Sequence, residues 1–349
     1  MGQAIFAGLK QDVISLLPLR QRSIRRLAPL LRRVDDLLAS VKPDLVRVHS
    51  VVLVITGDCN IHCVYCEYPT RYRGTKEFSA REWTDLIGEM RASGVTFFSV
   101  LGGEPLLRPD WVEIVDACLP SEVSLTTNGT FITEKIADKI AQRFRRVRVS
   151  LDASNAATYQ LVRRNERFQH VIRGIGLLKD RGVHVEVSYV IVDLNVSDIA
   201  KAAQLAAELE IPITYSIVGF ENNNQTATQD RTLMNRINKG EIVSELRAAS
   251  RSGAVVSINH KIVDFLLGTR PDRCAAPAGA LMVDGLGDVY PCCGPTPPIG
   301  NVRTEPWVSI KARHDASWEC YRRMEANGCE RCDAAVLSFG FVKAALGRG

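Results

Sequence analysis

From about residue 50 to residue 218, short β-rich apolar runs alternate with segments whose apolar residues recur every three or four positions. The first pattern is typical of strands and the second of one helix face. Six strands are predicted, at Val51–Ile55, Thr96–Leu101, Val123–Thr127, Val147–Leu151, Val185–Val192 and Ile213–Val218. Helices are predicted between them, near residues 79–92, 110–117, 133–143, 168–180 and 197–209. This alternation predicts an α/β fold with a parallel sheet, whose chemistry lies at the carboxyl ends of the strands.

The pattern differs on both sides of this region. Before it, an apolar spacing of three and four predicts a helix, on the residues Ile24, Leu27, Leu31, Val34, Leu38 and Val41. After it, helices are predicted near 238–251 and 260–267, with a short strand near Val255–Ile258. Beyond Asp272 the chain is rich in Cys, Pro and Gly and has little regular periodicity. The predicted boundaries give four parts, 1–48, 49–220, 221–271 and 272–349.

The net charge of +5 comes from the first part of the chain. Residues 1–43 hold eight Lys or Arg against three Asp, and the remainder is neutral, so nucleic acid is not an expected partner. The basic helix is expected to pack on the body of the protein, or to make weak contact with an anionic membrane surface. No signal-peptide pattern is present, so we expect a cytoplasmic protein in a reducing compartment, where cysteines, of which the chain has ten, bind metal rather than form disulfides.

Three closely spaced cysteines follow the first predicted strand. Cys59, Cys63 and Cys66 form a C-x3-C-x2-C run, which is typical of an iron–sulfur site. Three thiolates leave one iron of a four-iron cluster open for a substrate or cofactor. A zinc site with His62 as fourth ligand is the alternative, although it requires a sharp fold between two of the cysteines.

The run, with Tyr65 directly before its third cysteine, resembles the motif of the radical S-adenosylmethionine (SAM) superfamily. The resemblance covers about residues 49–335 and implies a partial (β/α)6 TIM-type barrel. It also implies a [4Fe–4S] cluster that binds SAM, and a flavodoxin or ferredoxin type electron donor. One electron would then cleave SAM, and the resulting radical would abstract hydrogen from a substrate carbon.

The superfamily's SAM-binding residues are expected at the ends of the strands. Gly102-Gly103-Glu104 is similar to the glycine-rich motif that binds the amino group of SAM, and we expect Glu104 to pair with this ligand rather than lie in the core. The other contacts that the resemblance implies are at Tyr65, Ser150, Asp152, Asn195 and Val218. An alternative role for Asp152 is to begin the next helix.

The tail cysteines resemble the SPASM extension of these enzymes, in its shortened twitch form. The ligands implied for a second, auxiliary [4Fe–4S] cluster are Cys274, Cys292, Cys329 and Cys332. Cys293 is the alternative to Cys292, and a four-cysteine structural zinc site is the alternative to the cluster.

The cysteine layout of the tail looks similar to that of an aminocyclitol dehydrogenase, which favours an oxidation reaction. The expected enzyme oxidises a sugar or cyclitol alcohol, with the auxiliary cluster as electron acceptor. Modification of a ribosomal peptide is one alternative, and epimerisation with Cys293 or Cys320 as hydrogen donor is another. A hypothesis of a different class is an iron–sulfur scaffold or electron carrier without catalysis.

Overall fold

The computed structural model of the chain describes residues 48–66, 72, 74–217, 237–258, 262, 266, 280–291 and 298–322, with side chains up to residue 315. Several predictions lie wholly or mostly outside these residues. They are the helical segment 1–48, the helix near 260–267, and the residues Val218, Cys274, Cys292, Cys293, Cys329 and Cys332. The side chain of Cys320 also lies outside them. None of the described helices has the length and apolar character needed to cross a lipid bilayer.

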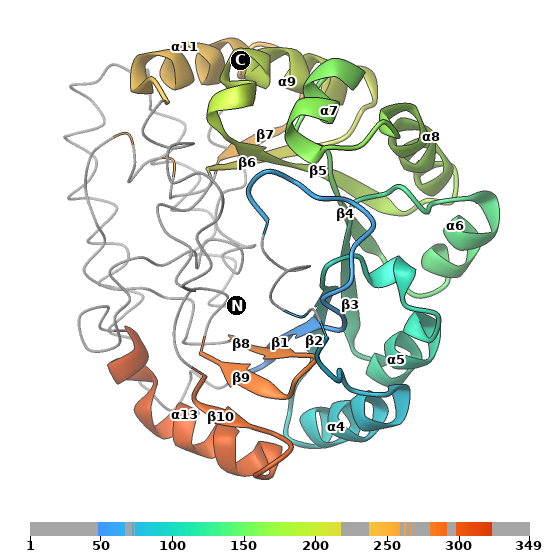
Figure 1. Cartoon of the computed structure of the whole chain (residues 1–349), viewed down its shortest axis with the longest axis vertical. Helices are drawn as coiled ribbons and strands as arrows, with labels where there is room; N and C mark the ends of the chain where they lie inside the picture. Colours follow the sequence, from blue (N-terminus) through green and yellow to red (C-terminus); the bar gives the residue numbers. More distant parts are fainter. Residues whose placement is uncertain are drawn as a thin grey trace, which may run out of the picture.

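All six predicted strands are present, and each pairs in parallel with the next. They are β1 (Ser50–Val54), β2 (Phe97–Leu101), β3 (Glu122–Thr127), β4 (Arg146–Ser150), β5 (His184–Ile191) and β6 (Ile213–Ile217). The helices predicted between them are α4 (Ala80–Ala92), α5 (Trp111–Cys118), α6 (Glu134–Ala141), α8 (Phe168–Lys179) and α9 (Ile199–Glu208). Figure 1 shows these helices on the convex side of a curved sheet, as a partial barrel requires. The α/β fold with a parallel sheet is therefore confirmed.

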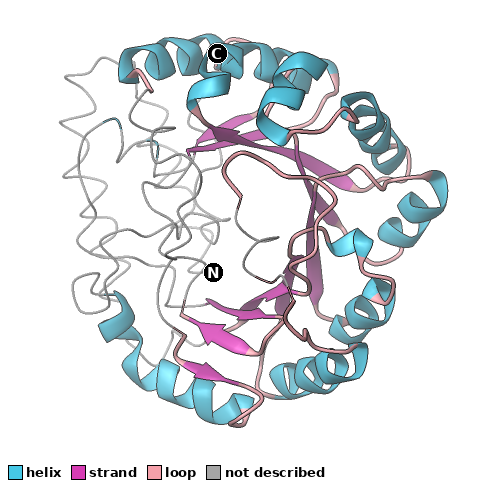
Figure 2. Cartoon of the chain, viewed as in Figure 1, coloured by secondary structure: helices cyan, strands magenta, loops and turns pink. Residues whose placement is uncertain are grey.

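The sheet continues beyond these six strands. Its order is β10-β9-β8-β1-β2-β3-β4-β5-β6-β7, so it crosses the predicted boundaries at residues 220 and 271. β7 (Val256–Ile258) pairs with β6, and β8 (Ala280–Asp284) pairs in parallel with β1. β9 (Asp288–Tyr290) and β10 (Gly300–Asn301) extend this edge in antiparallel order. Figure 2 shows all these strands on the inner side of an arc of helices, which has α11 (Lys239–Ala249) at one end and α13 (Trp307–Arg322) at the other.

The expectation of little regular structure beyond Asp272 is therefore wrong for β8, β9, β10 and α13. All five residues of β8 are buried, so the strand has no alternation of apolar and polar positions. A second helix between β4 and β5 was also not predicted. This helix, α7 (Ala156–Arg163), begins at Asn155, whose side chain accepts a hydrogen bond from Thr158 N.

β1 is an inner strand of the sheet, between β8 and β2, and is buried on both faces. Val51 and Leu53 belong to the main core between the sheet and the helices, whereas Val52 and Val54 pack on the inner face with Tyr72 and other residues. A strand buried on both faces gives a rigid base for the loop that follows it, which carries the three cysteines.

Candidate metal centre

The cysteine loop, residues 55–79, joins the carboxyl end of β1 to α4. Cys59, Cys63 and Cys66 are all partly buried on it, and none is in a disulfide. Cys66 N donates to Cys63 O at 3.1 Å, which makes a tight turn between these two ligands. The loop is tied to the end of α7 where Val64 N donates to Val162 O at 3.0 Å.

Among the described residues, no group of three His, Cys, Asp or Glu side chains is placed to bind a single metal ion. A four-iron cluster does not require such a placement, since each cysteine binds a different iron. Burial raises the pKa of Cys63 to about 12 and raises that of Cys59 as well. The thiols of Cys59 and Cys63 therefore keep their protons in the metal-free protein, and iron binding would displace these protons. This donor set fits an iron–sulfur cluster.

Gly102 and Gly103 lie against the cysteine loop itself. A Cβ at Gly102 would come within 2.4 Å of Thr56 O, and one at Gly103 within 2.2 Å of Asp58 O. Gly103 N donates to Thr56 O at 2.7 Å, so the two backbones are in direct contact. The two glycines were predicted to let a ligand approach the backbone closely. In the structure, the cysteine loop is what approaches them closely.

We predict that Gly103→Ala destabilises the protein. The added Cβ must displace the backbone of the cysteine loop, because Asp58 O and Gly57 O lie at 2.2 and 2.5 Å. Overpacking of this kind costs about 1–3 kcal/mol in the free energy of unfolding. Gly88→Ala is the matched control, since no atom lies within 4 Å of its added Cβ on α4, and it should stabilise the helix by about 0.5–1 kcal/mol. Equal unfolding midpoints for the two variants in denaturant would contradict the prediction.

Glu104 is fully buried, contrary to expectation. Its carboxylate accepts hydrogen bonds from Leu106 N at 3.1 Å, Thr127 Oγ1 at 2.7 Å and Asn128 N at 2.7 Å. Burial raises the pKa of the carboxyl, and these three hydrogen bonds act in the opposite direction. Glu104 therefore joins the ends of β2 and β3, and retains acceptor capacity for one further donor.

The turn after β3 contacts the cysteine loop from the other side. Asn128 Nδ2 lies 3.8 Å from Cys59 Sγ and 2.9 Å from Asn60 Oδ1. Asn60 Nδ2 in turn donates to Thr130 Oγ1 at 2.9 Å. The Asn128-Gly129 pair forms a turn, with φ of 76° at Gly129, and the side chains of Asn128 and Thr130 also hold Cys59 and Asn60 in place.

Beside the cysteines, the partly buried Tyr65 forms a triad with the buried side chains of Asp152 and Arg163. The Tyr65 hydroxyl donates to Asp152 Oδ2 at 2.5 Å and accepts from Arg163 Nη1 at 2.8 Å. Arg163 also pairs with Asp152 at 3.0 Å and donates to the carbonyl oxygen of Ser150 at 2.9 Å. Asp152 has φ of 58°, in the left-handed region, and its other oxygen accepts from Val190 N at 2.7 Å. The sequence prediction brought Tyr65 and Asp152 to the site but missed Arg163.

Arg163 could have been noticed because it is a cation on the buried face of α7, in line with Tyr159 and Val162. Its Nε atom is buried and has no hydrogen-bond partner among the described residues. The positive charge of Arg163 is paired with Asp152, so the guanidinium fixes this carboxylate and the Tyr65 hydroxyl beside the cysteines.

Asn195 lies after β5, as predicted, in the short 3-10 helix η3 (Asp193–Asp198), and its side-chain amide is hydrogen-bonded to the backbone. Oδ1 accepts from Val192 N at 2.8 Å, while Nδ2 donates to Asp152 O at 3.1 Å and Val190 O at 2.9 Å. These bonds fix the chain around Asp152. A direct contact between Asn195 and SAM stays a prediction.

The β8–β9 hairpin holds the far side of the cysteine loop. Asp284 is buried and accepts hydrogen bonds from the hydroxyls of Tyr72 at 2.9 Å and Tyr290 at 3.2 Å. Phe78 N donates to Gly285 O at 2.7 Å. The part of the chain that leads to Cys292 is therefore packed directly against the loop of the first three cysteines.

Comparison with known proteins agrees with this arrangement. Residues 53–206 match the family model described as the Radical SAM superfamily. Mycofactocin maturase MftC of Mycolicibacterium smegmatis is 27% identical over 257 residues, which cover 68% of this chain and 62% of that protein. The AdoMet-dependent heme synthase of Methanosarcina barkeri is 27% identical over 286 residues, 73% of this chain and 80% of that protein. The chain thus spans less than two thirds of the length of MftC.

A solved structure shares the fold. Streptococcus suis SuiB, in the crystal structure bound to precursor peptide SuiA, has a TM-score of 0.60 at 16% identity, and the match covers 80% of this chain and 69% of that one. A likeness at this identity concerns the arrangement of helices and strands, which is the α/β fold described above.

Proposed function

We propose that this chain, which contains a radical SAM superfamily domain at residues 53–206, is an enzyme that modifies a peptide. The observation that carries the proposal is the loop of Cys59, Cys63 and Cys66 at the carboxyl end of β1, next to the Gly102-Gly103-Glu104 segment. The three cysteines would hold a [4Fe–4S] cluster with one open iron, to which SAM binds. When bound, the cluster and SAM supply a radical that can abstract hydrogen from an unactivated carbon.

The protein residues around the loop would bind SAM and exclude water. Glu104 has capacity for one more donor, which we assign to the SAM ammonium group. Arg163, which pairs with Asp152 and donates to the Tyr65 hydroxyl, would hold these two side chains in place beside SAM. The contacts still proposed with the rest of SAM come from Tyr65, Ser150, Asp152, Asn195 and Val218.

Peptide modification replaces alcohol oxidation as the first choice. The supporting observations are the sequence similarity to a maturase and a fold shared with a protein that was crystallised with a precursor peptide. The auxiliary cluster at Cys274, Cys292, Cys329 and Cys332 remains part of the proposal, with a flavodoxin or ferredoxin type donor. So do the cytoplasmic location and a weak membrane contact of residues 1–48.

The proposal is tested by anaerobic reconstitution followed by reaction with SAM and dithionite. We expect about eight irons per chain, four for each cluster, and formation of 5′-deoxyadenosine. Stoichiometric zinc with about four irons would reject the auxiliary cluster, and absence of 5′-deoxyadenosine would reject the enzyme.

The substrate class is tested separately. Short peptides encoded beside the gene and a panel of sugar and cyclitol alcohols are each incubated with the reduced enzyme and SAM. Mass spectrometry should detect a changed peptide together with one 5′-deoxyadenosine for each event. Conversion of an alcohol to a ketone, with every peptide unchanged, would restore the oxidation hypothesis.

A further inference from the structure

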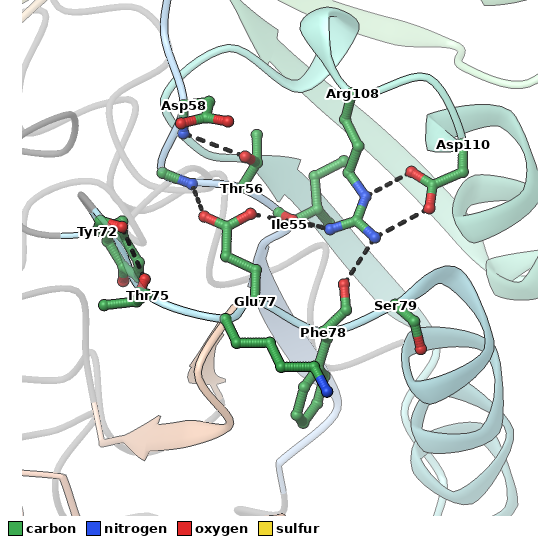
Figure 3. A network of polar contacts seen from close by, with 12 residues as sticks. Ile55, Thr56, Asp58, Tyr72, Thr75, Glu77, Phe78, Ser79, Arg108 and Asp110 are labelled. Carbon is green, nitrogen blue, oxygen red and sulfur yellow. Dashed lines mark hydrogen bonds and ion pairs between the residues drawn. The ribbon is translucent and has the colours of Figure 1, made fainter.

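One guanidinium joins the two ends of the cysteine loop. Arg108 Nη1 donates to the carbonyl oxygen of Ile55, where the loop leaves β1, at 2.7 Å. Arg108 Nη2 donates to the carbonyl oxygen of Phe78, just before α4, also at 2.7 Å (Figure 3). All three cysteines lie between these two points, so Arg108 closes the loop that carries them.

Arg108 is itself held from both sides. Asp110 accepts from Nε at 2.5 Å and from Nη2 at 3.0 Å, in the two-pronged arrangement that only a guanidinium can make with a carboxylate. Glu77 lies on the loop side, with one oxygen 4.0 Å from Nη1 and the other accepting from Gly57 N at 2.5 Å. Figure 3 shows Arg108 between these two carboxylates. Its side chain is only 10% exposed, so solvent screens these interactions weakly.

The same segment also carries the proposed SAM-binding residues. Arg108 directly follows the short helix η2 (Pro105–Leu107), which begins after Glu104. Gly103 N donates to Thr56 O, and Glu104 N donates to Asp58 O, both at 2.7 Å. Gly103, Glu104 and Arg108 each make one of these contacts with the start of the cysteine loop, so residues 103–108 are held against it.

We propose that Arg108 is a positioning residue. It fixes the position of the cysteine loop relative to the Gly102-Gly103-Glu104 segment, so that the cluster and SAM would be held next to each other. The proposed role in SAM binding rests on the function proposed above. The positioning of the loop does not, because it depends on contacts within the protein. Lysine cannot replace Arg108, since one ammonium group cannot reach two carbonyls and a bidentate carboxylate in this planar arrangement.

The first experiment compares Arg108→Lys with Arg143→Lys in the metal-free full chain. Arg143 is the matched control, because it makes the same two-pronged contact with Asp116, at 2.6 and 3.0 Å, without touching the cysteine loop. Alkylation of each cysteine by iodoacetamide is followed by mass spectrometry. We expect Cys59 and Cys63 to react about tenfold faster in Arg108→Lys, because the loss of one charged hydrogen bond would make opening of the loop about tenfold more favourable. In Arg143→Lys they should react at the parent rate.

Cys118 reports whether the variant is folded, because it is buried in α5, away from the loop. If Cys118 also becomes reactive in Arg108→Lys, the comparison is made with Asp110→Asn, which keeps Arg108 but removes the charge that orients it. Parent rates at Cys59 and Cys63 in a folded variant would overturn the proposal.

The second experiment uses the reconstituted protein. SAM affinity, expressed per cluster, should fall about tenfold in Arg108→Lys, and the effect of SAM on the electron paramagnetic resonance spectrum of the reduced cluster should change. A purely structural role would lower the unfolding midpoint and leave both properties as in the parent, which would overturn the SAM-binding part. If the parent itself forms no 5′-deoxyadenosine, the proposed function fails, while the alkylation result still decides the positioning of the loop.

Discussion

A Cys63→Ala variant is expected to lose SAM cleavage completely and to bind about four irons fewer than the parent. Each cysteine of the loop would hold one iron, and the described residues around the loop offer no other thiol, because Cys118 is the only other described cysteine side chain and is buried in α5. Cys63 also makes the turn to Cys66, so its position within the loop is fixed. Iron content and 5′-deoxyadenosine after anaerobic reconstitution measure the effect.

Cys118→Ala is the control for Cys63→Ala. Cys118 Sγ lies 3.6 Å from the carbonyl oxygen of Ile114 within its own helix and serves as a small buried side chain. This variant should keep the parent's iron and its rate of 5′-deoxyadenosine formation. Formation of 5′-deoxyadenosine at the parent rate by Cys63→Ala would mean that the catalytic cluster lies elsewhere.

The sequence predicted the strands and the cysteine loop because both depend on local patterns. Short β-branched runs form the six strands, and the spacing of the cysteines places them on one loop. The pairing of β8 with β1 was beyond such reasoning, since residues 280 and 50 are paired in register although they are far apart in the chain. A strand with every residue buried also carries no alternation from which to recognise it.

The same limit applies to the roles of polar side chains. Glu104 and Arg163 are both buried, and their charges are satisfied by groups from other strands and helices. A sequence pattern places a residue at the end of a strand but does not report how many donors surround it. Arg108 is a further example, since its role appears only when Ile55 and Phe78 are seen to be neighbours.

Glu104→Ala is expected to destabilise the fold as well as weaken SAM binding. The variant leaves three buried donors without their acceptor: Leu106 N, Thr127 Oγ1 and Asn128 N. Each unsatisfied donor costs about 1–3 kcal/mol, and since the three share one site we expect a total of roughly 3 kcal/mol in the free energy of unfolding. Chemical denaturation measures this loss, and titration with SAM measures the affinity.

Two further variants separate the contributions at Glu104. Glu104→Gln keeps the shape and one acceptor oxygen but turns an NH₂ group toward donors, so its stability should lie between that of the parent and that of Glu104→Ala. Glu122→Ala, at the exposed start of β3, should change the stability by about 0.5 kcal/mol or less. If Glu104→Ala unfolds at the same denaturant concentration as Glu122→Ala while its SAM affinity falls, the carboxylate pairs with the ligand, as the sequence suggested. The other outcome is that stability and affinity fall together, with Glu104→Gln intermediate in both. Glu104 then supports SAM binding by joining β2 to β3.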